Sequence, residues 1–206
     1  MSGRRVILAS NNPGKVAELQ QLLADLDLEV LAQSALAVPE AEETGRSFVE
    51  NALLKARNAC AHTGLPAIAD DSGLEVDALR GAPGIHSARY AGPAATDADN
   101  VEKLLGALAD TPKAERTARF QCVAVYLRHA DDPTPIIAQG TWEGRILEAP
   151  RGSGGFGYDP VFLVSEANRS AAELAPTQKN AVSHRGQALR QLAEALRRRE
   201  GVPDGN

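Results

Sequence analysis

Short apolar runs alternate with helically spaced apolar residues through the first part of the chain. Residues 6–9 and 28–32 are short runs rich in Val, Ile, Leu and Ala, the composition of buried strands. Between them, residues 16–26 repeat Val and Leu at the spacing of an amphipathic helix. A strand, a loop, a helix and a second strand is the opening of an α/β fold. We therefore expect a sheet covered by helices.

The next helix and strand lead to a pair of acidic residues. Ser47 with Glu50 three residues later predicts a capping box, and the apolar residues that follow predict a helix ending at 64–66. The apolar run 67–69 then reads as a central strand that stops at Asp70 and Asp71. The following Ser-Gly pair predicts a turn, and residues 74–79 a separate half-exposed strand.

The second half of the chain continues the same alternation. Thr96 or Asp97 is expected to cap a helix with an apolar face from Val101 to Leu108. Residues 117–127 and 135–147 predict a hairpin joined at 131–134. Residues 149–160 are irregular and rich in glycine, and 183–199 predict a final helix. We expect one two-lobed domain over residues 1–200 and a frayed tail at 201–206.

Composition narrows the class of protein. The 206 residues are 43% hydrophobic and 24% charged, with a net charge of −5, so no overall basic field favours nucleic acid. The two cysteines, Cys60 and Cys122, lack metal-site spacing. No apolar run reaches membrane-spanning length. We expect a cytoplasmic protein that binds neither nucleic acid nor membrane.

The loop at residues 10–15, Ser-Asn-Asn-Pro-Gly-Lys, joins the first strand to the first helix. Backbone N–H groups at a helix start can bind an anion, and Lys15 would add a positive charge. The spacing differs from a common P-loop, because Val16 follows the Gly-Lys pair. An ordinary turn with an exposed lysine is the alternative.

Four acids, Glu42, Glu43, Asp70 and Asp71, are candidates for a magnesium site. Mg²⁺ uses one or two carboxylates, waters and substrate phosphates. Neighbouring strand residues point to opposite faces, so both aspartates reach one site only if the backbone bends. We expect Asp71 to face the site and Asp70 to be held by hydrogen bonds or a lysine. The alternative is a set of solvated acids.

Two further segments are candidates for binding a base. Residues 152–160 place Phe156 and Tyr158 among four glycines, where backbone can approach a ligand and aromatic rings can stack on it. Lys179, His184 and Arg185 surround the start of the last helix. The alternatives are a flexible loop with Phe156 in the core, and a capped helix with solvent-facing His and Arg.

Together these segments resemble the inosine triphosphate pyrophosphatase family, and within it the bacterial pyrophosphatases that act on the non-standard purine nucleotides dITP, ITP and XTP. The resemblance extends from about residue 6 to 196. The segments that carry it are Ser10-Asn11-Asn12-Pro13-Gly14-Lys15, Glu43-Thr44-Gly45-Arg46-Ser47-Phe48-Val49-Glu50-Asn51-Ala52, Ala69-Asp70-Asp71-Ser72-Gly73-Leu74, Gly81-Ala82-Pro83-Gly84-Ile85, Gly155-Phe156-Gly157-Tyr158-Asp159-Pro160 and Ser183-His184-Arg185-Gly186.

The resemblance implies a long mixed central sheet flanked by helices, two lobes with an active-site cleft between them, a homodimer and Mg²⁺ dependence. The implied reaction converts a nucleoside triphosphate and water to the monophosphate and pyrophosphate. Asp71 is implied as proton acceptor and metal ligand, together with Glu42 or Glu43. Lys15 and Lys55 would supply positive charge to the phosphates. The implied nucleotide-binding residues are Ser10, Asn11, Asn12, Pro13, Gly14, Lys15, Ser72, Phe156, Gly157, Tyr158, Asp159, Lys179, His184 and Arg185.

Two other functions are alternatives to the implied purine pyrophosphatase activity. A Maf-like pyrophosphatase acting on dTTP or UTP is a related architecture, but its motifs differ from those at 155–159 and 183–185. A non-catalytic nucleotide-binding protein would keep the lysines and the glycine-rich loop without needing the acid pair. Release of pyrophosphate from ITP with Mg²⁺, compared with EDTA, separates the enzymes from the binding protein.

Overall fold

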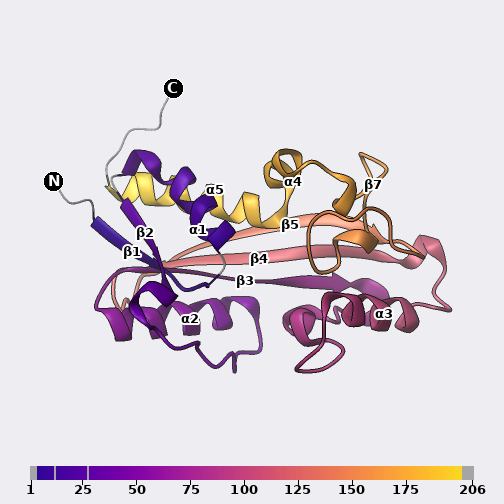
Figure 1. Ribbon diagram of the computed structural model, residues 1–206, viewed down its shortest axis with the longest axis horizontal. Coiled ribbons are helices and arrows are strands. Elements are labelled where there is room, and N and C mark those ends of the chain that lie inside the picture. The colour runs from indigo at the N-terminus through magenta and orange to yellow at the C-terminus, as the bar shows by residue number, and fades with distance from the viewer. Residues whose placement is uncertain (1–3, 12, 27, 201–206) are drawn as a thin grey trace. The chain divides into compact units, whose positions relative to one another are not determined.

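The computed structural model describes residues 4–11, 13–26 and 28–200. The strands of this part of the chain are β1 (Arg4–Leu8), β2 (Leu28–Ala32), β3 (Ala67–Val76), β4 (Thr117–Leu127), β5 (Ile136–Ile146), β6 (Phe162–Val164) and β7 (Arg169–Ser170). The α-helices are α1 (Pro13–Leu22), α2 (Phe48–Thr63), α3 (Asp97–Ala107), α4 (Pro176–Val182) and α5 (His184–Glu200) (Figure 1).

Within the described residues, the seven strands form one sheet in the order β2-β1-β3-β4-β5-β6-β7. Strand β1 pairs in parallel with β2 and β3, whereas β6 pairs in antiparallel fashion with β5 and β7. The predicted α/β fold with a mixed central sheet flanked by helices is confirmed.

The chain forms two compact units. The first unit comprises Met1–Asp71, Cys122–Gln139 and Gln187–Asn206, and the second comprises Ser72–Gln121 and Gly140–Gly186. Strands β3, β4 and β5 and helix α5 each contribute residues to both units. Each unit has a core of its own.

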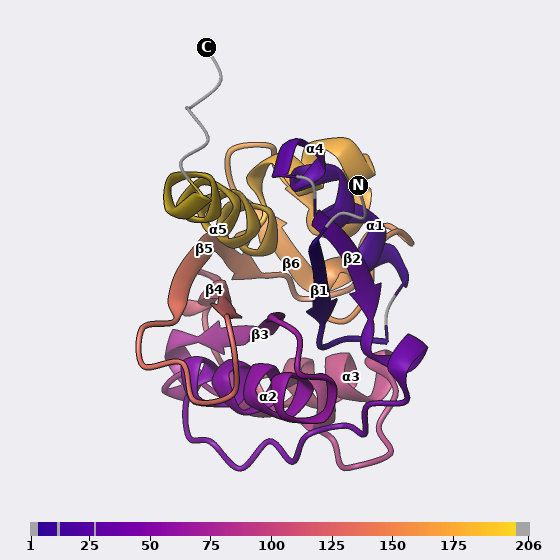
Figure 2. The same ribbon diagram turned by 90° about the vertical axis from the view of Figure 1, so that its left-hand side faces the viewer.

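In the first unit, the sheet lies between α1 and α5 on one face and α2 on the other (Figure 2). Alternate strand residues belong to opposite layers, as the strand period of two requires. Val6 and Ile68 are buried in the cluster that contains α1 and α5. Ile7 and Ala69 are buried in the cluster that contains α2. The strands are therefore apolar on both faces, which explains their unbroken apolar runs.

Helix α2 begins and ends as the sequence predicts. The Ser47 hydroxyl accepts a hydrogen bond from the Glu50 N–H, and the Glu50 carboxylate accepts one from the Ser47 hydroxyl. Gly64 ends the helix with φ of 66°, a left-handed conformation that favours glycine. The capping residues thus fix where the α2 side chains project.

The core of the second unit is built around aromatic residues and α3. Phe120, Trp142 and Phe162 pack together, with the rings of Phe120 and Phe162 4.5 Å apart. Helix α3 buries Val101 and Leu104 in the same cluster. Thr96, one of the two predicted capping residues, begins this helix and forms a capping box with Asp99.

The predicted break at the acid pair is wrong. Strand β3 runs without interruption through Asp70, Asp71, Ser72 and Gly73 to Val76, and residues 77–79 form a 3₁₀ turn. A Ser-Gly pair can also adopt extended backbone, and both halves of the strand bury apolar side chains. Pairing and burial therefore outweigh the local turn preference.

Other boundaries differ in smaller ways. The first helix stops at Leu22, and a 3₁₀ turn covers Ala24–Leu26. Helix α4 and the short strands β6 and β7 were not predicted, because each has too few residues to show a hydrophobic period. The predicted tail at 201–206 lies outside the described residues. Across the described ranges, no helix is both long and apolar enough to cross a membrane.

Candidate active site

The adjacent acids Asp70 and Asp71 contact different lysines. The Lys15 Nζ of α1 lies 2.8 Å from Asp70 Oδ2, whereas the Lys55 Nζ of α2 lies 3.1 Å from Asp71 Oδ1. Asp70 has the strand parity of Ile68, which faces α1 and α5, and Asp71 has the parity of Ala69, which faces α2. The expectation that a lysine holds Asp70 is confirmed, and no backbone bend is needed.

Lys55 joins two carboxylates. Its Nζ lies 3.1 Å from Asp71 Oδ1 and 3.1 Å from Glu43 Oε1. All three side chains are mostly buried, with exposures of 18% for Lys55, 12% for Asp71 and 29% for Glu43. Glu42 is exposed on the same loop. The structure thus brings Glu43, and not Glu42, to the lysine that contacts Asp71.

Asn51, which was not among the predicted site residues, also orients Asp71. Its Nδ2 donates to Asp71 Oδ2 at 3.3 Å, and its Oδ1 accepts from the Gly45 N–H at 2.9 Å. Asn51 is fully buried. Asn51 and Lys55 are four residues apart and so share one face of α2. Two polar residues at this spacing, on a helix whose other buried residues are alanines and Cys60, are the sequence signal for this role.

Burial and neighbouring charges shift the pKa values of Asp71 and Lys55 in this cluster. Burial raises the pKa of Asp71, the Lys55 charge lowers it, and the Glu43 charge raises it again, so the net direction is upward. Burial lowers the pKa of Lys55, but the charges of Asp71 and Glu43 outweigh it and the net direction is again upward. An additional positive charge near the two carboxylates would therefore stabilise the ionised form of Asp71.

The carboxylates of this cluster are of the kind and number that commonly hold a magnesium ion. Among the described residues, no group of three or more His, Cys, Asp and Glu side chains could hold a metal ion. Mg²⁺ is commonly held by only one or two carboxylates together with phosphate oxygens and water. Asp71 and Glu43 are two carboxylates that contact one ammonium group, and burial together with the Glu43 charge raises the pKa of Asp71, which a nearby cation would lower.

The loop before α1 lies in the first unit. The Ser10 N–H donates to the Leu8 carbonyl at 2.7 Å, and the Asn11 side chain donates to Glu40 Oε1 at 3.2 Å. Gly14 is exposed and Lys15 reaches Asp70. The predicted binding residue Asn12 lies outside the described residues, as does the side chain of Pro13. Only 23% of the Lys15 side chain is accessible, so this lysine is mostly buried.

In the second unit, the glycine-rich loop presents Phe156. This ring is 67% exposed and lies 4.6 Å from Lys179 Nζ. Lys179 also forms an ion pair with the buried Asp159, whose Oδ2 accepts a hydrogen bond from the Phe156 N–H at 2.9 Å. Phe156 is thus outside the core and is held from beneath by charged groups. Ser72, in β3, is exposed.

Tyr158 lies in the same loop, but unlike Phe156 it is buried and anchors the loop. Its ring is 4% exposed and its hydroxyl donates to the Ser87 carbonyl at 2.8 Å. The Ser87 hydroxyl donates to the Gly84 carbonyl and accepts from the Leu74 N–H. Burial raises the pKa of Tyr158, so the hydroxyl stays protonated as a donor. Tyr158 is therefore a buried anchor and Phe156 the exposed aromatic.

His184 is buried rather than solvent-facing. Its ring stacks on Phe120, with centroids 4.7 Å apart and planes 12° apart, and Trp142 lies at 6.4 Å. The Gly186 N–H donates to the Ser183 hydroxyl at 3.1 Å, so Ser183 caps the start of α5. Arg185 is half-buried beside it. The second unit thus contains Phe156, Asp159, Lys179, His184 and Arg185.

The fold and these clusters define an α/β protein with a carboxylate–lysine site on strand β3. The chain belongs to the Ham1 family, whose profile matches residues 6–195.

Relatives match almost the whole length. A protein of Thioalkalivibrio sulfidiphilus named dITP/XTP pyrophosphatase is 62% identical over 195 residues, which are 95% of this chain and 100% of the relative. One of the same name from Methylococcus capsulatus is 63% identical, covering 94% of this chain and 96% of the relative. The structure of a HAM1 protein from Coxiella burnetii has a TM-score of 0.91 and 52% identity, covering 95% of this chain and 99% of that one.

Proposed function

We propose that this protein hydrolyses the non-standard purine nucleoside triphosphates ITP, dITP and XTP to the monophosphate and pyrophosphate. The observation that carries the proposal is the 62–63% identity, over almost the full length, to proteins named dITP/XTP pyrophosphatase. Removal of these nucleotides from the pool would keep them out of DNA and RNA. Each unit contains one of the clusters described above, and each cluster is given a role in the proposal.

The first unit supplies the groups for the phosphate chemistry. Asp71 is the proposed acceptor of the proton from the attacking water, and Lys55 fixes the position of its carboxylate at 3.1 Å. Glu43 and Asp71 would hold Mg²⁺, which when bound neutralises charge on the phosphates. Lys15 and residues 10–14 are the proposed phosphate-binding groups, with Lys15 also neutralising Asp70.

The second unit supplies groups for the base. Exposed Phe156 is the proposed stacking surface, and Lys179, His184 and Arg185 are proposed donors to the 6-keto oxygen. Hypoxanthine and xanthine carry that acceptor, whereas adenine carries a 6-amino donor. A further donor near purine C2 would repel the 2-amino group of guanine and so exclude dGTP. Ser72 and residues 157–159 complete the proposed nucleotide-binding set.

The remaining expectations from the family resemblance are part of the same proposal. They are a single catalytic domain over residues 1–200, a homodimer, a cytoplasmic location and no nucleic-acid or membrane partner. The net charge of −5 supports the last of these.

The test is a panel of nucleoside and deoxynucleoside triphosphates with purified protein and Mg²⁺, scoring pyrophosphate against orthophosphate. We expect pyrophosphate from ITP, dITP and XTP and little from ATP or dGTP. Orthophosphate as the first product would refute cleavage between the α and β phosphates. Preference for dTTP or UTP would favour the Maf-like alternative, and binding without turnover would favour a nucleotide sensor.

A further inference from the structure

The segment that carries Phe156 is tied to helix α3 by one hydrogen bond. The Gly157 N–H donates to Asp97 Oδ2 at 2.6 Å, across 60 residues of sequence. Gly157 lies between exposed Phe156 and buried Tyr158. Asp97, at the start of α3, therefore binds the backbone between these two aromatic residues.

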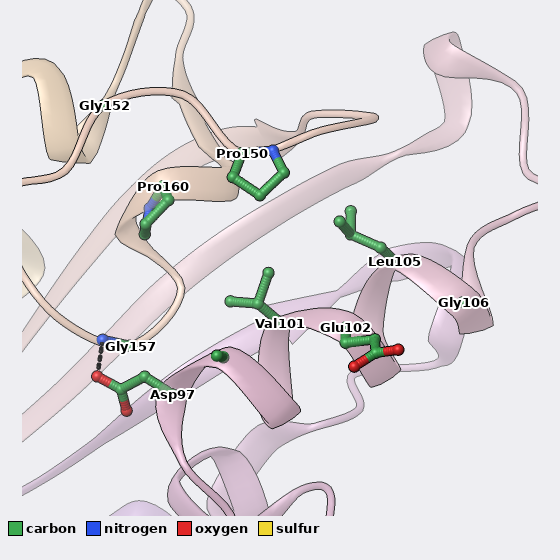
Figure 3. Close-up of a pocket in the computed structure, with 10 residues that line it drawn as sticks. Asp97, Val101, Glu102, Leu105, Gly106, Pro150, Gly152, Gly157 and Pro160 are labelled. Carbon is green, nitrogen blue, oxygen red and sulfur yellow. Dashed lines mark hydrogen bonds between the residues drawn. The ribbon is translucent and has the colours of Figure 1, made fainter.

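Beside this bond, α3 and the loop are separated by a pocket. The pocket has a volume of about 680 Å³ and is lined mainly by apolar side chains and glycines. Figure 3 shows Val101 and Leu105 of α3 on one side and Pro150 and Pro160 on the other, with the Asp97–Gly157 bond at one end. Because the intervening space is open, side-chain packing does not hold the loop against α3 there.

The helix end that carries Asp97 is itself firmly placed. Thr96 and Asp99 form a reciprocal capping box immediately around it. Asn100, 2% exposed, accepts from the Ala91 N–H at 2.8 Å and donates to the Ala88 carbonyl at 3.2 Å. Asp97 is exposed but stands on a fixed support, so its carboxylate can define a position for the loop.

The residues on either side of Gly157 are held by different groups. The Phe156 N–H donates to Asp159, and the Tyr158 hydroxyl donates to the Ser87 carbonyl. Gly157 has φ of 59°, and a Cβ there would meet no atom within 4 Å. Side-chain packing therefore does not fix the Phe156–Gly157 peptide. Its carbonyl accepts from the Asp159 N–H at 3.3 Å within the loop, and the bond from its N–H to Asp97 is the one that ties this peptide to α3.

We propose that Asp97 is a positioning residue, which fixes the Phe156–Tyr158 segment in the orientation that binds the purine. The proposal rests on the proposed function for the base-stacking role of Phe156. It assigns to Asp97 an effect on substrate affinity and none on the chemical step, because Asp71, Lys55 and Glu43 belong to a separate cluster in the first unit.

Three variants test it. Asp97→Ala removes the acceptor, Asp97→Asn keeps an acceptor oxygen without the charge, and Glu102→Ala removes an exposed acid from the same helix and the same pocket. For each, KM and kcat for ITP are measured with Mg²⁺, and the exchange rate of the Gly157 amide proton is measured by NMR on the protein alone.

We expect Asp97→Ala to raise KM about tenfold, the loss of one charge-assisted hydrogen bond, with kcat within about twofold and faster exchange at Gly157. Asp97→Asn should restore most of the affinity, and Glu102→Ala should match the unmodified protein. An unchanged KM and unchanged exchange in Asp97→Ala would overturn the proposal. Equal defects in Asp97→Asn and Asp97→Ala would also overturn it, because charge at the helix start would then be the cause.

The proposed function can fail separately. If the unmodified protein does not hydrolyse ITP, that function is wrong, yet the Gly157 amide still reports whether Asp97 holds the loop. Unaltered exchange in Asp97→Ala would then reject the positioning role as well. Faster exchange with no nucleotide bound by any variant would reject the link to purine binding.

Discussion

Asp70 and Asp71 are neighbours in β3, yet their carboxylates lie on opposite faces of the sheet and contact Lys15 and Lys55, respectively. The two acids, which are chemically equivalent in the sequence, are thereby given different surroundings. Asp70 is almost fully buried and paired, whereas Asp71 keeps 12% of its side chain accessible and shares its lysine with Glu43.

The first prediction separates these two acids. Asp71→Asn should lower kcat by about 10²–10⁴-fold, the usual contribution of a general base. Asp70→Asn should instead destabilise the fold by about 1–3 kcal/mol, because it removes a buried carboxylate charge 2.8 Å from the mostly buried Lys15 ammonium. Steady-state kinetics and urea unfolding of both variants provide the measurements. Turnover of Asp71→Asn within a few-fold of normal would show that the base is assigned wrongly.

The second prediction concerns the acidic loop. Glu43→Gln should raise the Mg²⁺ concentration needed for half-maximal activity by at least about tenfold, because one of two proposed carboxylate ligands is lost. Glu42→Gln is the matched control, since Glu42 is adjacent but exposed. EDTA should abolish activity in all three proteins. A larger effect at Glu42 would transfer the ligand role to that residue.

The third prediction follows from the raised pKa of Asp71, for which burial is the main cause. With the folded pKa above the ordinary value of 3.8, ionisation of Asp71 opposes folding. The stability that the neutral carboxyl contributes is present below that ordinary value and is lost as pH rises through the raised pKa.

Asp71→Asn should consequently become more stable than the unmodified protein as pH increases through this range without metal. Thermal unfolding at a series of pH values measures the difference. Activity should change in the opposite sense and fall as pH is lowered through the pKa of Asp71. A stability difference that does not depend on pH would contradict the assignment.

The fourth prediction concerns the exposed aromatic ring. Phe156→Ala should raise KM for ITP about 5- to 150-fold, since stacking contributes about 1–3 kcal/mol per base. It should leave the thermal stability nearly unchanged, because the ring is 67% exposed. Ile137→Ala, which alters another exposed apolar residue in the first unit, should change neither quantity. An equal KM in the two variants would argue against base stacking.

The fifth prediction compares two glycines of one loop. Gly155 and Gly157 have φ of 74° and 59°, so alanine at either costs about 1–2 kcal/mol of backbone strain. A Cβ on Gly155 would also lie 2.0 Å from Asp159 Oδ2, whereas one on Gly157 would meet open space. Gly155→Ala should therefore be clearly the more destabilising in thermal unfolding. The reverse order would show that Asp159 moves aside freely.

Local patterns in the sequence predict most of the first unit. Spacing alone predicts that Ser47 and Glu50 cap helix α2. Unbroken apolar runs likewise predict strands that are buried on both faces. The same patterns place Lys15 on the helix that follows β1, and Lys55 on the helix that precedes β3. That is why the separation of Asp70 from Asp71 could be expected before their lysines were known.

The second unit was less predictable because its contacts join distant segments. Nothing local indicates that His184 stacks on Phe120, or that Asp97 binds the Gly157 N–H. A Ser-Gly pair after two acids is a turn by composition, and only pairing along β3 makes it extended. That Glu43 rather than Glu42 contacts Lys55 likewise depends on the path of an irregular loop.

The alternation along β3 also limits how the gene can change at this point. Deletion or insertion of one residue between Ala67 and Asp70 would exchange the faces of the two acids, so that each would meet the wrong helix. A two-residue change would preserve the faces but displace both carboxylates along the strand by about 7 Å, beyond the reach of their lysines. Length variation should therefore be absent here while the neighbouring loops tolerate it.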